Sequence, residues 1–158
     1  MKNILFIYLT LATTICITTS CKKKKGCTDP ISINYDADAD KDDGSCQYAG
    51  LGGNTTIVAF PEHHGKPIIS SAAYPDTAYV KFNVIESPGV NPNAYDLIVV
   101  GDSGEDHVHL EGLKPGKYFI YMTGYDSSIA THRVKGGIPY VLTAKSGEVD
   151  LRIPVSED

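Results

Sequence analysis

Apolar and polar residues alternate along several short segments of this chain, and this alternation constrains the fold more than any other feature of the sequence. In the segment 147–155, GEVDLRIPV, every second residue is apolar: Val149, Leu151, Ile153 and Val155. The segment 78–85, AYVKFNVI, repeats the pattern with Ala78, Val80, Phe82 and Val84. Because successive side chains of a β-strand point to opposite faces, both segments predict half-buried strands of an antiparallel sheet.

Five further segments have the length and composition of strands. They are 55–60, 95–101, 105–111, 116–124 and 137–144, and each is bounded by Pro, Gly, Asn or Asp. No segment shows a convincing helical period, and the 15 glycines and 9 prolines favour a fold rich in turns. About seven short strands predict an all-β protein, with an Ig-like Greek-key β-sandwich over residues 55–158.

The segment 113–118, LKPGKY, has the form of a tyrosine corner, in which the Tyr118 hydroxyl bonds to the backbone across the top of a sandwich. An ordinary turn before a strand is the alternative. The strand that follows is apolar on both faces, because Phe119 and Tyr121 alternate with inward-facing residues. Either a loop such as 128–140 covers the second face, or that face contacts a partner.

The N-terminus has the architecture of an export signal: a short positive start, an apolar run at 4–17 and small residues before Cys21. The run is too short to cross a bilayer, which takes roughly 20 apolar residues. The sequence TTSC at 18–21 resembles the lipobox of bacterial lipoproteins. This resemblance implies a signal peptide at 1–20 and a lipid on Cys21; ordinary secretory cleavage is the alternative.

Residues 21–26 then form a lysine-rich tether, which is either a solvated spacer or a source of adhesion to anionic lipids. With Cys16 in the leader and Cys21 lipidated, Cys27 and Cys46 remain as a pair that an oxidising compartment is expected to join. The disulfide would close an acidic module at 27–46, followed by a glycine-rich linker at 47–54.

The acidic module contains six aspartates, and dense carboxylates suit calcium, which takes oxygen ligands. The candidate calcium ligands are Asp36, Asp38, Asp40, Asp42 and Asp43. Their spacing does not fit the EF-hand register, in which a glycine and a bidentate glutamate occupy fixed positions. A solvated, stapled loop without a cation is therefore the alternative.

Two parts of the chain resemble known families. The segment 26–46, GCTDPISINYDADADKDDGSC, resembles a short module of exported and surface proteins from Bacteroidota-type bacteria, which implies export and a disulfide but no settled activity. The segments 65–68, GKPI, and 104–126, with G-L-x-P-G-x-Y, together resemble the transthyretin-like or carboxypeptidase-regulatory-like domain. That resemblance extends over 55–155 and implies a non-catalytic sandwich that stabilises, spaces or binds.

All five histidines lie after residue 60. His107 and His109 stand two apart in a predicted strand, so both are expected to point outward and could present two imidazoles to one Zn²⁺ or Cu²⁺. His63 and His64, in a predicted turn, could complete such a site. Exposed histidines that bind nothing are the alternative.

The sequence offers little for catalysis. GDSG at 101–104 resembles the loop around a protease nucleophile, but the chain is too short for that double-barrel enzyme, and a hairpin turn explains the segment better. G-x-S-x-G, H-E-x-x-H and phosphate-cradling loops are absent from the sequence. A net charge of −5 argues against a nucleic-acid partner.

The sequence therefore predicts a lipid-anchored, non-enzymatic protein of the cell envelope, on the periplasmic or extracellular side of a membrane. Its β-sandwich is expected to bind an envelope protein or a glycan. The alternative function is metal binding, with Zn²⁺ or Cu²⁺ at the outward histidines and calcium at the aspartate-rich loop.

Overall fold

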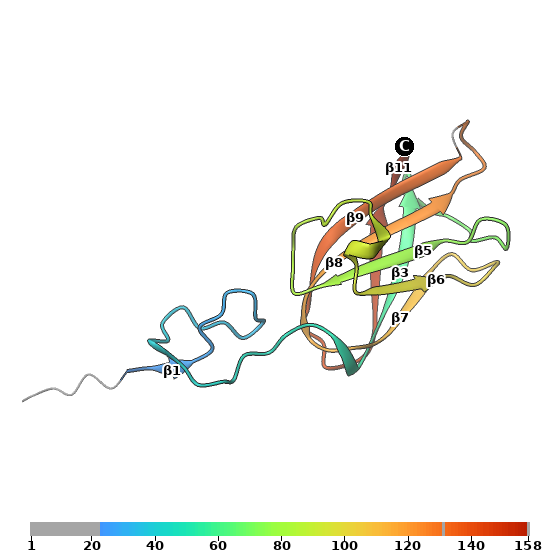
Figure 1. Ribbon diagram of the computed structural model, residues 1–158. Helices are drawn as coiled ribbons and strands as arrows, with labels where there is room; N and C mark the ends of the chain where they lie inside the picture. Colours follow the sequence, from blue (N-terminus) through green and yellow to red (C-terminus); the bar gives the residue numbers. More distant parts are fainter. Residues whose placement is uncertain (1–22, 131, 158) are drawn as a thin grey trace, which may run out of the picture.

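The computed structural model describes residues 23–130 and 132–157, so the predicted leader and Cys21 lie outside the described residues. Within the described residues the protein is built from strands, and its helical element is the 3₁₀ turn η1 (Pro92–Ala94). Figure 1 shows a small N-terminal part beside a larger β-sandwich, with the C-terminus at the end of the sandwich remote from that part.

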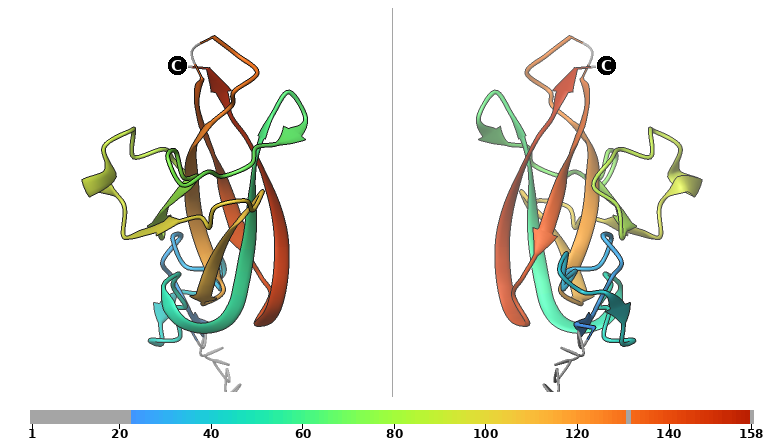
Figure 2. Two further views of the ribbon diagram at one scale, coloured as in Figure 1. Left: turned by 90° about the vertical axis from the view of Figure 1, so that its right-hand side faces the viewer. Right: turned by 90° about the vertical axis from the view of Figure 1, so that its left-hand side faces the viewer.

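Two sheets pack face to face and form the sandwich (Figures 1 and 2). The first contains β3 (Leu51–His63), β4 (Lys66–Pro67), β7 (Val108–Leu113) and β10 (Ser146–Pro154). The second has the order β11 (Ser156–Glu157), β9 (Arg133–Leu142), β8 (Gly116–Tyr125), β5 (Thr77–Phe82) and β6 (Leu97–Val100). Seven of these strands have four residues or more, which confirms the predicted all-β sandwich.

One pairing differs from the predicted antiparallel arrangement. Strand β10 runs parallel to β3, with Val149 opposite Ile57 and Ile153 opposite Pro61. Antiparallel pairing is imposed only on strands that a tight hairpin joins, and these two strands lie at opposite ends of the domain sequence. The chain reaches β10 from β9, which belongs to the other sheet, so β10 is free to align with β3 in either direction.

The hydrophobic core lies between the two sheets and follows the predicted alternation. Ala78, Val80, Ile120 and Met122 are fully buried, as are Leu110 and Ile153. Val84 is an exception. Strand β5 ends at Phe82, and Asn83 has a φ of 61°, so the alternation stops there and Val84 packs outside the sandwich core.

The outer face of β8 carries Phe119 and Tyr121, and the structure shows what covers them. Tyr95, Ala94 and Val84 pack against this pair, and all three come from the long connection between β5 and β6. The Tyr95 hydroxyl donates a hydrogen bond to Gly89 O (2.7 Å), which closes that connection on itself. The second face is therefore covered by residues 84–95, not by the predicted segment 128–140; Figure 2 shows this connection projecting from the side of the sandwich.

The tyrosine corner is confirmed, and it also joins the sandwich to the N-terminal part. The Tyr118 hydroxyl donates to Lys114 O (2.6 Å) and accepts from Gly50 N–H (3.1 Å). At the start of β8, Gly116 lies so close to Ala49 that a Cβ on it would be 2.4 Å from the Ala49 backbone. The absence of a side chain at Gly116 therefore lets the incoming chain pack against the sandwich.

The N-terminal part is held by the disulfide between Cys27 and Cys46, with a Cα–Cα distance of 4.8 Å, as predicted. Its boundaries differ from the prediction at both ends. Lys25 and Gly26 form β1, which pairs with β2 (Lys41–Asp42), so the end of the lysine run belongs to the folded unit. The glycine-rich linker is also shorter than 47–54, because β3 already begins at Leu51.

Candidate functional site

A groove lies on the outer side of the five-stranded sheet, and four of the thirteen residues that line it are tyrosines; we call it the tyrosine groove. It has a volume of 490 Å³. Its lining includes Tyr74, Tyr79, Tyr121, Tyr125, Thr123, Arg133 and Lys135. The groove is therefore a concave surface that combines aromatic rings with hydrogen-bonding and cationic groups.

Strand register explains why these side chains meet. Tyr79 of β5 lies opposite Tyr121 of β8, and Arg133 of β9 lies opposite Tyr125. Alternate residues of β8 point outward, so Tyr121 and Tyr125 share one face. Tyr74, from the segment before β5, stacks on Tyr125 with a centroid distance of 4.3 Å and planes 9° apart.

The groove offers hydrogen-bond donors as well as aromatic faces. Burial, together with Tyr79, raises the pKa of Tyr121, so this phenol keeps its proton and remains a hydrogen-bond donor. Tyr74 is half exposed, which leaves its outer face open to a ligand. Flat aromatic faces next to hydroxyls are suited to ligands with both apolar and polar surfaces.

The groove lies at the end of the sandwich remote from the N-terminal part. Gly116, the first residue of β8, contacts Ala49, whereas Tyr125 is the last of the ten residues in β8. At about 3.3 Å per residue, the two ends of this strand are about 30 Å apart. The disulfide-bonded module and the tyrosine groove therefore occupy opposite ends of the molecule.

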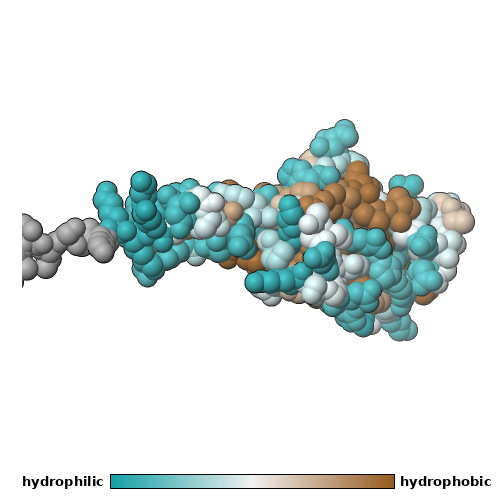
Figure 3. Space-filling model, turned by 90° about the horizontal axis from the view of Figure 1, so that it is seen from below, coloured by the Kyte–Doolittle hydropathy of each residue, from teal (hydrophilic) through white to brown (hydrophobic). Residues whose placement is uncertain are grey.

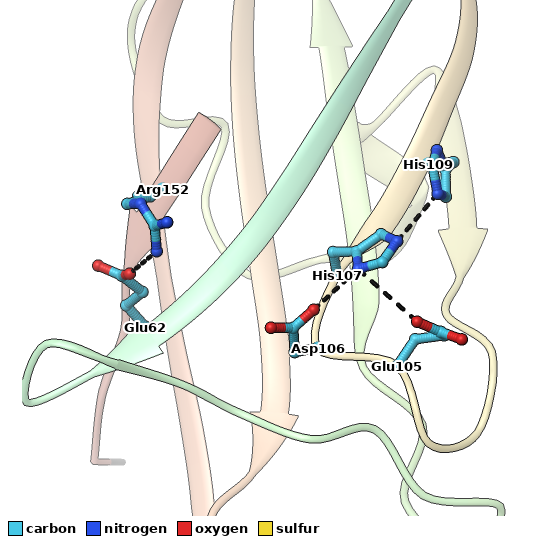
Figure 4. Close-up of polar contacts among 6 residues, drawn as sticks. All are labelled: Glu62, Glu105, Asp106, His107, His109 and Arg152. Atoms are coloured by element: carbon cyan, nitrogen blue, oxygen red, sulfur yellow. Dashed lines mark hydrogen bonds and ion pairs between the residues drawn. The ribbon is translucent and has the colours of Figure 1, made fainter. Parts of the chain in front are cut away.

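The predicted pair His107 and His109 does come together (Figure 4). Their Nε2 atoms are 2.9 Å apart, and His107 Nδ1 is 2.8 Å from Asp106 Oδ1. An ionised carboxylate only accepts hydrogen bonds, so His107 donates from Nδ1 and its Nε2 accepts from His109. Val108 and Leu110 are buried, as the predicted alternation requires.

The surroundings of this pair form a row across the outer face of the first sheet. The ring centroids of Phe60 and His107 are 5.3 Å apart, and the Arg152 guanidinium lies 5.2 Å from the Phe60 ring centroid. Arg152 also forms an ion pair with Glu62, as Figure 4 shows. The segment 101–107 connects strands of different sheets, so it is a crossover rather than the predicted hairpin turn.

His63 and His64 do not complete the His107–His109 pair. Among residues 23–130 and 132–157, three metal-ligating side chains do converge on one place. They belong to His63, His64 and Glu157. The sequence pattern gave no sign of Glu157, which lies far along the chain in β11.

The five candidate calcium ligands do not converge in the described part of the chain. Asp36 accepts a hydrogen bond from Lys24 Nζ (3.0 Å), which lowers the pKa of that carboxyl. Asp38 also pairs with Lys24, and Asp40 accepts from the Lys24 backbone. Asp42 and Asp43 accept from the backbone N–H groups of nearby turn residues. These carboxylates therefore order a loop by capping its turns and binding one lysine.

Asp76 is a buried carboxylate that sequence reasoning missed. It is fully buried, and its two carboxylate oxygens have no hydrogen-bond partner among the described residues. Burial raises the pKa of Asp76 from 3.8 to about 7. A buried carboxyl group that keeps its proton makes the stability of the fold depend on pH.

The fold and the tyrosine groove together define an all-β sandwich protein with a disulfide-stapled N-terminal module. No family model matches the chain, and no curated protein matches it. Among solved structures, a DUF4876 family protein from Bacteroides thetaiotaomicron is similar at a TM-score of 0.36 and 17% identity. The similarity covers 65% of this chain but spans only 24% of that protein's chain.

Within the described residues, no helix is both long enough and apolar enough to cross a membrane.

Proposed function

We propose that the protein is a lipid-anchored, non-enzymatic component of the cell envelope whose β-sandwich is a binding module. The observation that carries the proposal is the position of the tyrosine groove at the end remote from the N-terminal part. A lipid on Cys21 would join the membrane to that part directly, so the groove would face away from the membrane surface. In the view of Figure 3 the larger hydrophobic patch lies on the sandwich, whereas the visible surface of the N-terminal part is mostly hydrophilic.

The class of ligand that the groove suits best is a glycan. Tyrosine rings pack against the apolar C–H faces of sugars, while phenols, Thr123 and Arg133 can bond to sugar hydroxyls. The stacked pair Tyr74 and Tyr125 offers a flat, preformed surface of this kind. An envelope protein is the other partner class, and the experiment below separates the two.

The anchor is tested by expressing the full chain in a bacterium that processes lipoproteins. Intact mass of the membrane-fraction protein should show cleavage before Cys21, acylation of Cys21 and the loss of two hydrogens at the disulfide. Cys21→Ser should abolish the acyl mass and release the protein into the soluble fraction. Cys16→Ser, which changes a cysteine of the leader only, is the matched control and should leave anchoring intact. An unacylated wild-type protein would overturn the anchor.

The groove is tested by screening the mature protein against a panel of immobilised oligosaccharides and against solubilised envelope proteins. Tyr74→Ala removes one half of the stacked pair and should weaken binding of a selected oligosaccharide about tenfold. Tyr35→Ala, an exposed tyrosine of the acidic module, is the control and should bind like the wild type. Equal binding by Tyr74→Ala would exclude the groove, and selective capture of an envelope protein would replace the glycan by a protein partner.

A second candidate function is metal binding at His107 and His109, which the 2.9 Å separation of their Nε2 atoms favours. A metal ion can replace the proton that these two nitrogens share, with Asp106 holding the His107 ring through Nδ1. Titration with Zn²⁺ and Cu²⁺ should reveal a site that both His107→Ala and His109→Ala eliminate. An unchanged number of bound metal ions per chain in both variants would exclude this pair.

A further inference from the structure

His63 is a buried histidine with one nitrogen engaged and the other without a partner. Its side chain is 2% exposed. Nδ1 lies 2.8 Å from Asp126 Oδ2, so Nδ1 carries the proton and donates a hydrogen bond to the carboxylate. Nε2 is buried and has no hydrogen-bond partner among the described residues. A lone pair in that situation costs free energy unless something binds it.

The neighbouring His64 is turned toward His63 by a tight hairpin. His63 pairs with Lys66, so His64 and Gly65 form the two-residue loop between β3 and β4. Both have positive φ, 51° and 75°, which is the geometry of a type I′ turn. Asn, Asp and Gly are usual at the first position, whereas histidine is under strain there. The turn stacks the His64 ring on that of His63, with centroids 4.0 Å apart.

Glu157 is brought to the same place by a different part of the chain. Strand β11 pairs with β9, and Glu157 lies opposite Val134. One carboxylate oxygen of Glu157 is 3.7 Å from His63 Nε2, too far for a hydrogen bond but close enough to share a cation. One ligand atom each from His63, His64 and Glu157 lie within 4.8 Å of one another.

We propose that His63, His64 and Glu157 bind a divalent transition-metal ion, with Zn²⁺ as the best-matched ion. Two imidazoles and one carboxylate are a donor set that zinc takes in proteins, at about 2.0 to 2.2 Å from each ligand. Around a tetrahedral ion such ligand atoms stand about 3.4 Å apart. The side chains of His64 and Glu157 are exposed and can rotate toward this spacing, while buried His63 stays in place.

The groups behind His63 complete the arrangement. Asp126 accepts from His63 Nδ1 and, at its other oxygen, from the Ser128 backbone N–H (2.8 Å). A carboxylate behind a ligating histidine fixes the ring orientation and its tautomer, which is the usual outer partner of zinc-bound imidazole. Asp126 is therefore a positioning residue, and the cavity that His63 and His64 line could admit a fourth ligand such as water.

The metal would join the two sheets at the end of the sandwich. His63 and His64 belong to the β3–β4 hairpin of the first sheet, and Glu157 belongs to β11 of the second. The site is separate from the His107–His109 pair, with which it shares no ligand.

The experiment uses the full mature protein carrying His107→Ala and His109→Ala, so that the other histidine pair cannot contribute. Calorimetric titration with Zn²⁺ should give one site per chain, and Co²⁺ should give the visible absorption of a tetrahedral complex. His64→Ala and Glu157→Gln alter exposed residues and should each weaken Zn²⁺ binding by more than about tenfold. Asp126→Asn should weaken it by about 10- to 100-fold while the tetrahedral Co²⁺ spectrum remains.

Two results would overturn the proposal. One is the absence of stoichiometric Zn²⁺ binding at micromolar metal. The other is binding that His64→Ala and Glu157→Gln leave unchanged. Glu148→Gln, another exposed glutamate on a strand, is the matched control and should bind Zn²⁺ like the parent protein.

Discussion

Replacing Asp76 by asparagine should stabilise the folded protein at neutral pH and leave its stability unchanged in acid. The Asp76 carboxyl is fully buried with no hydrogen-bond partner among the described residues, and its pKa is raised to about 7. The folded state therefore holds a proton that the unfolded chain releases above its ordinary pKa of 3.8. Stability falls as the pH rises between these two values and is level above them.

The magnitude follows from the shift. A change from 3.8 to about 7, at about 1.4 kcal/mol per pH unit, amounts to about 4 kcal/mol of stability lost by pH 8. Asparagine has the same shape and is neutral at every pH, so Asp76→Asn should gain up to this amount. The asparagine amide, like the neutral Asp76 acid, would lack hydrogen-bond partners. The variant and the wild type should therefore have the same free energy of unfolding in acid.

Denaturant unfolding of both proteins at a series of pH values from about 4 to 8 measures this difference. The quantity to plot is the difference in free energy of unfolding between variant and wild type. The pH-dependent contributions of the groups that both proteins share cancel in this difference. Asp126, whose pKa is lowered to about 2 by hydrogen bonds from Ser128 and His63, loses its contribution only at lower pH. A difference that stays constant across the series would refute the assignment of the raised pKa to Asp76.

Other predictions concern the contact between the sandwich and the N-terminal part, and the disulfide between Cys27 and Cys46. Tyr118→Phe removes the hydroxyl at the tyrosine corner and should lower the free energy of unfolding by about 1 to 3 kcal/mol in denaturant titration; an unchanged midpoint would contradict this role. Gly116→Ala places a methyl against Ala49 and should destabilise the protein by about 1 to 3 kcal/mol, with thermal melting as the measurement. Replacing Cys27 and Cys46 by serine removes about 3 kcal/mol from the N-terminal part alone. Limited proteolysis should then cut that part while the sandwich resists; simultaneous loss of both would show that they unfold as one unit.

The strands could be predicted from the sequence because their information is local. Ile153 and Val80 are buried where the period of two places them. The errors arise where one backbone conformation or a distant pairing decides the structure. Asn83, at a φ of 61°, turns Val84 away from the core. The parallel alignment of β3 and β10 depends on how the two sheets connect, which no local pattern records.

The candidate sites divide in the same way. His107 directly precedes β7 and His109 lies within it, and their spacing of two residues was enough to predict their shared face. Glu157 reaches His63 through the pairing of β11 with β9, and Lys24 contacts Asp36 beside the pairing of β1 with β2. Such pairs are set by tertiary structure, and neither residue carries a signal in its own neighbourhood.

The disulfide between Cys27 and Cys46 also determines how the molecule transmits mechanical load. Tension that enters at the N-terminal end passes across the sulfur–sulfur bond, so the covalent path bypasses residues 28–45. Without that bond the same segment could lengthen by about 60 Å. Beyond Cys46 the load enters β3, which is hydrogen-bonded along its length to β7 and β10. Pulling along the strand shears many of these bonds together, so the sandwich resists extension from its N-terminal end.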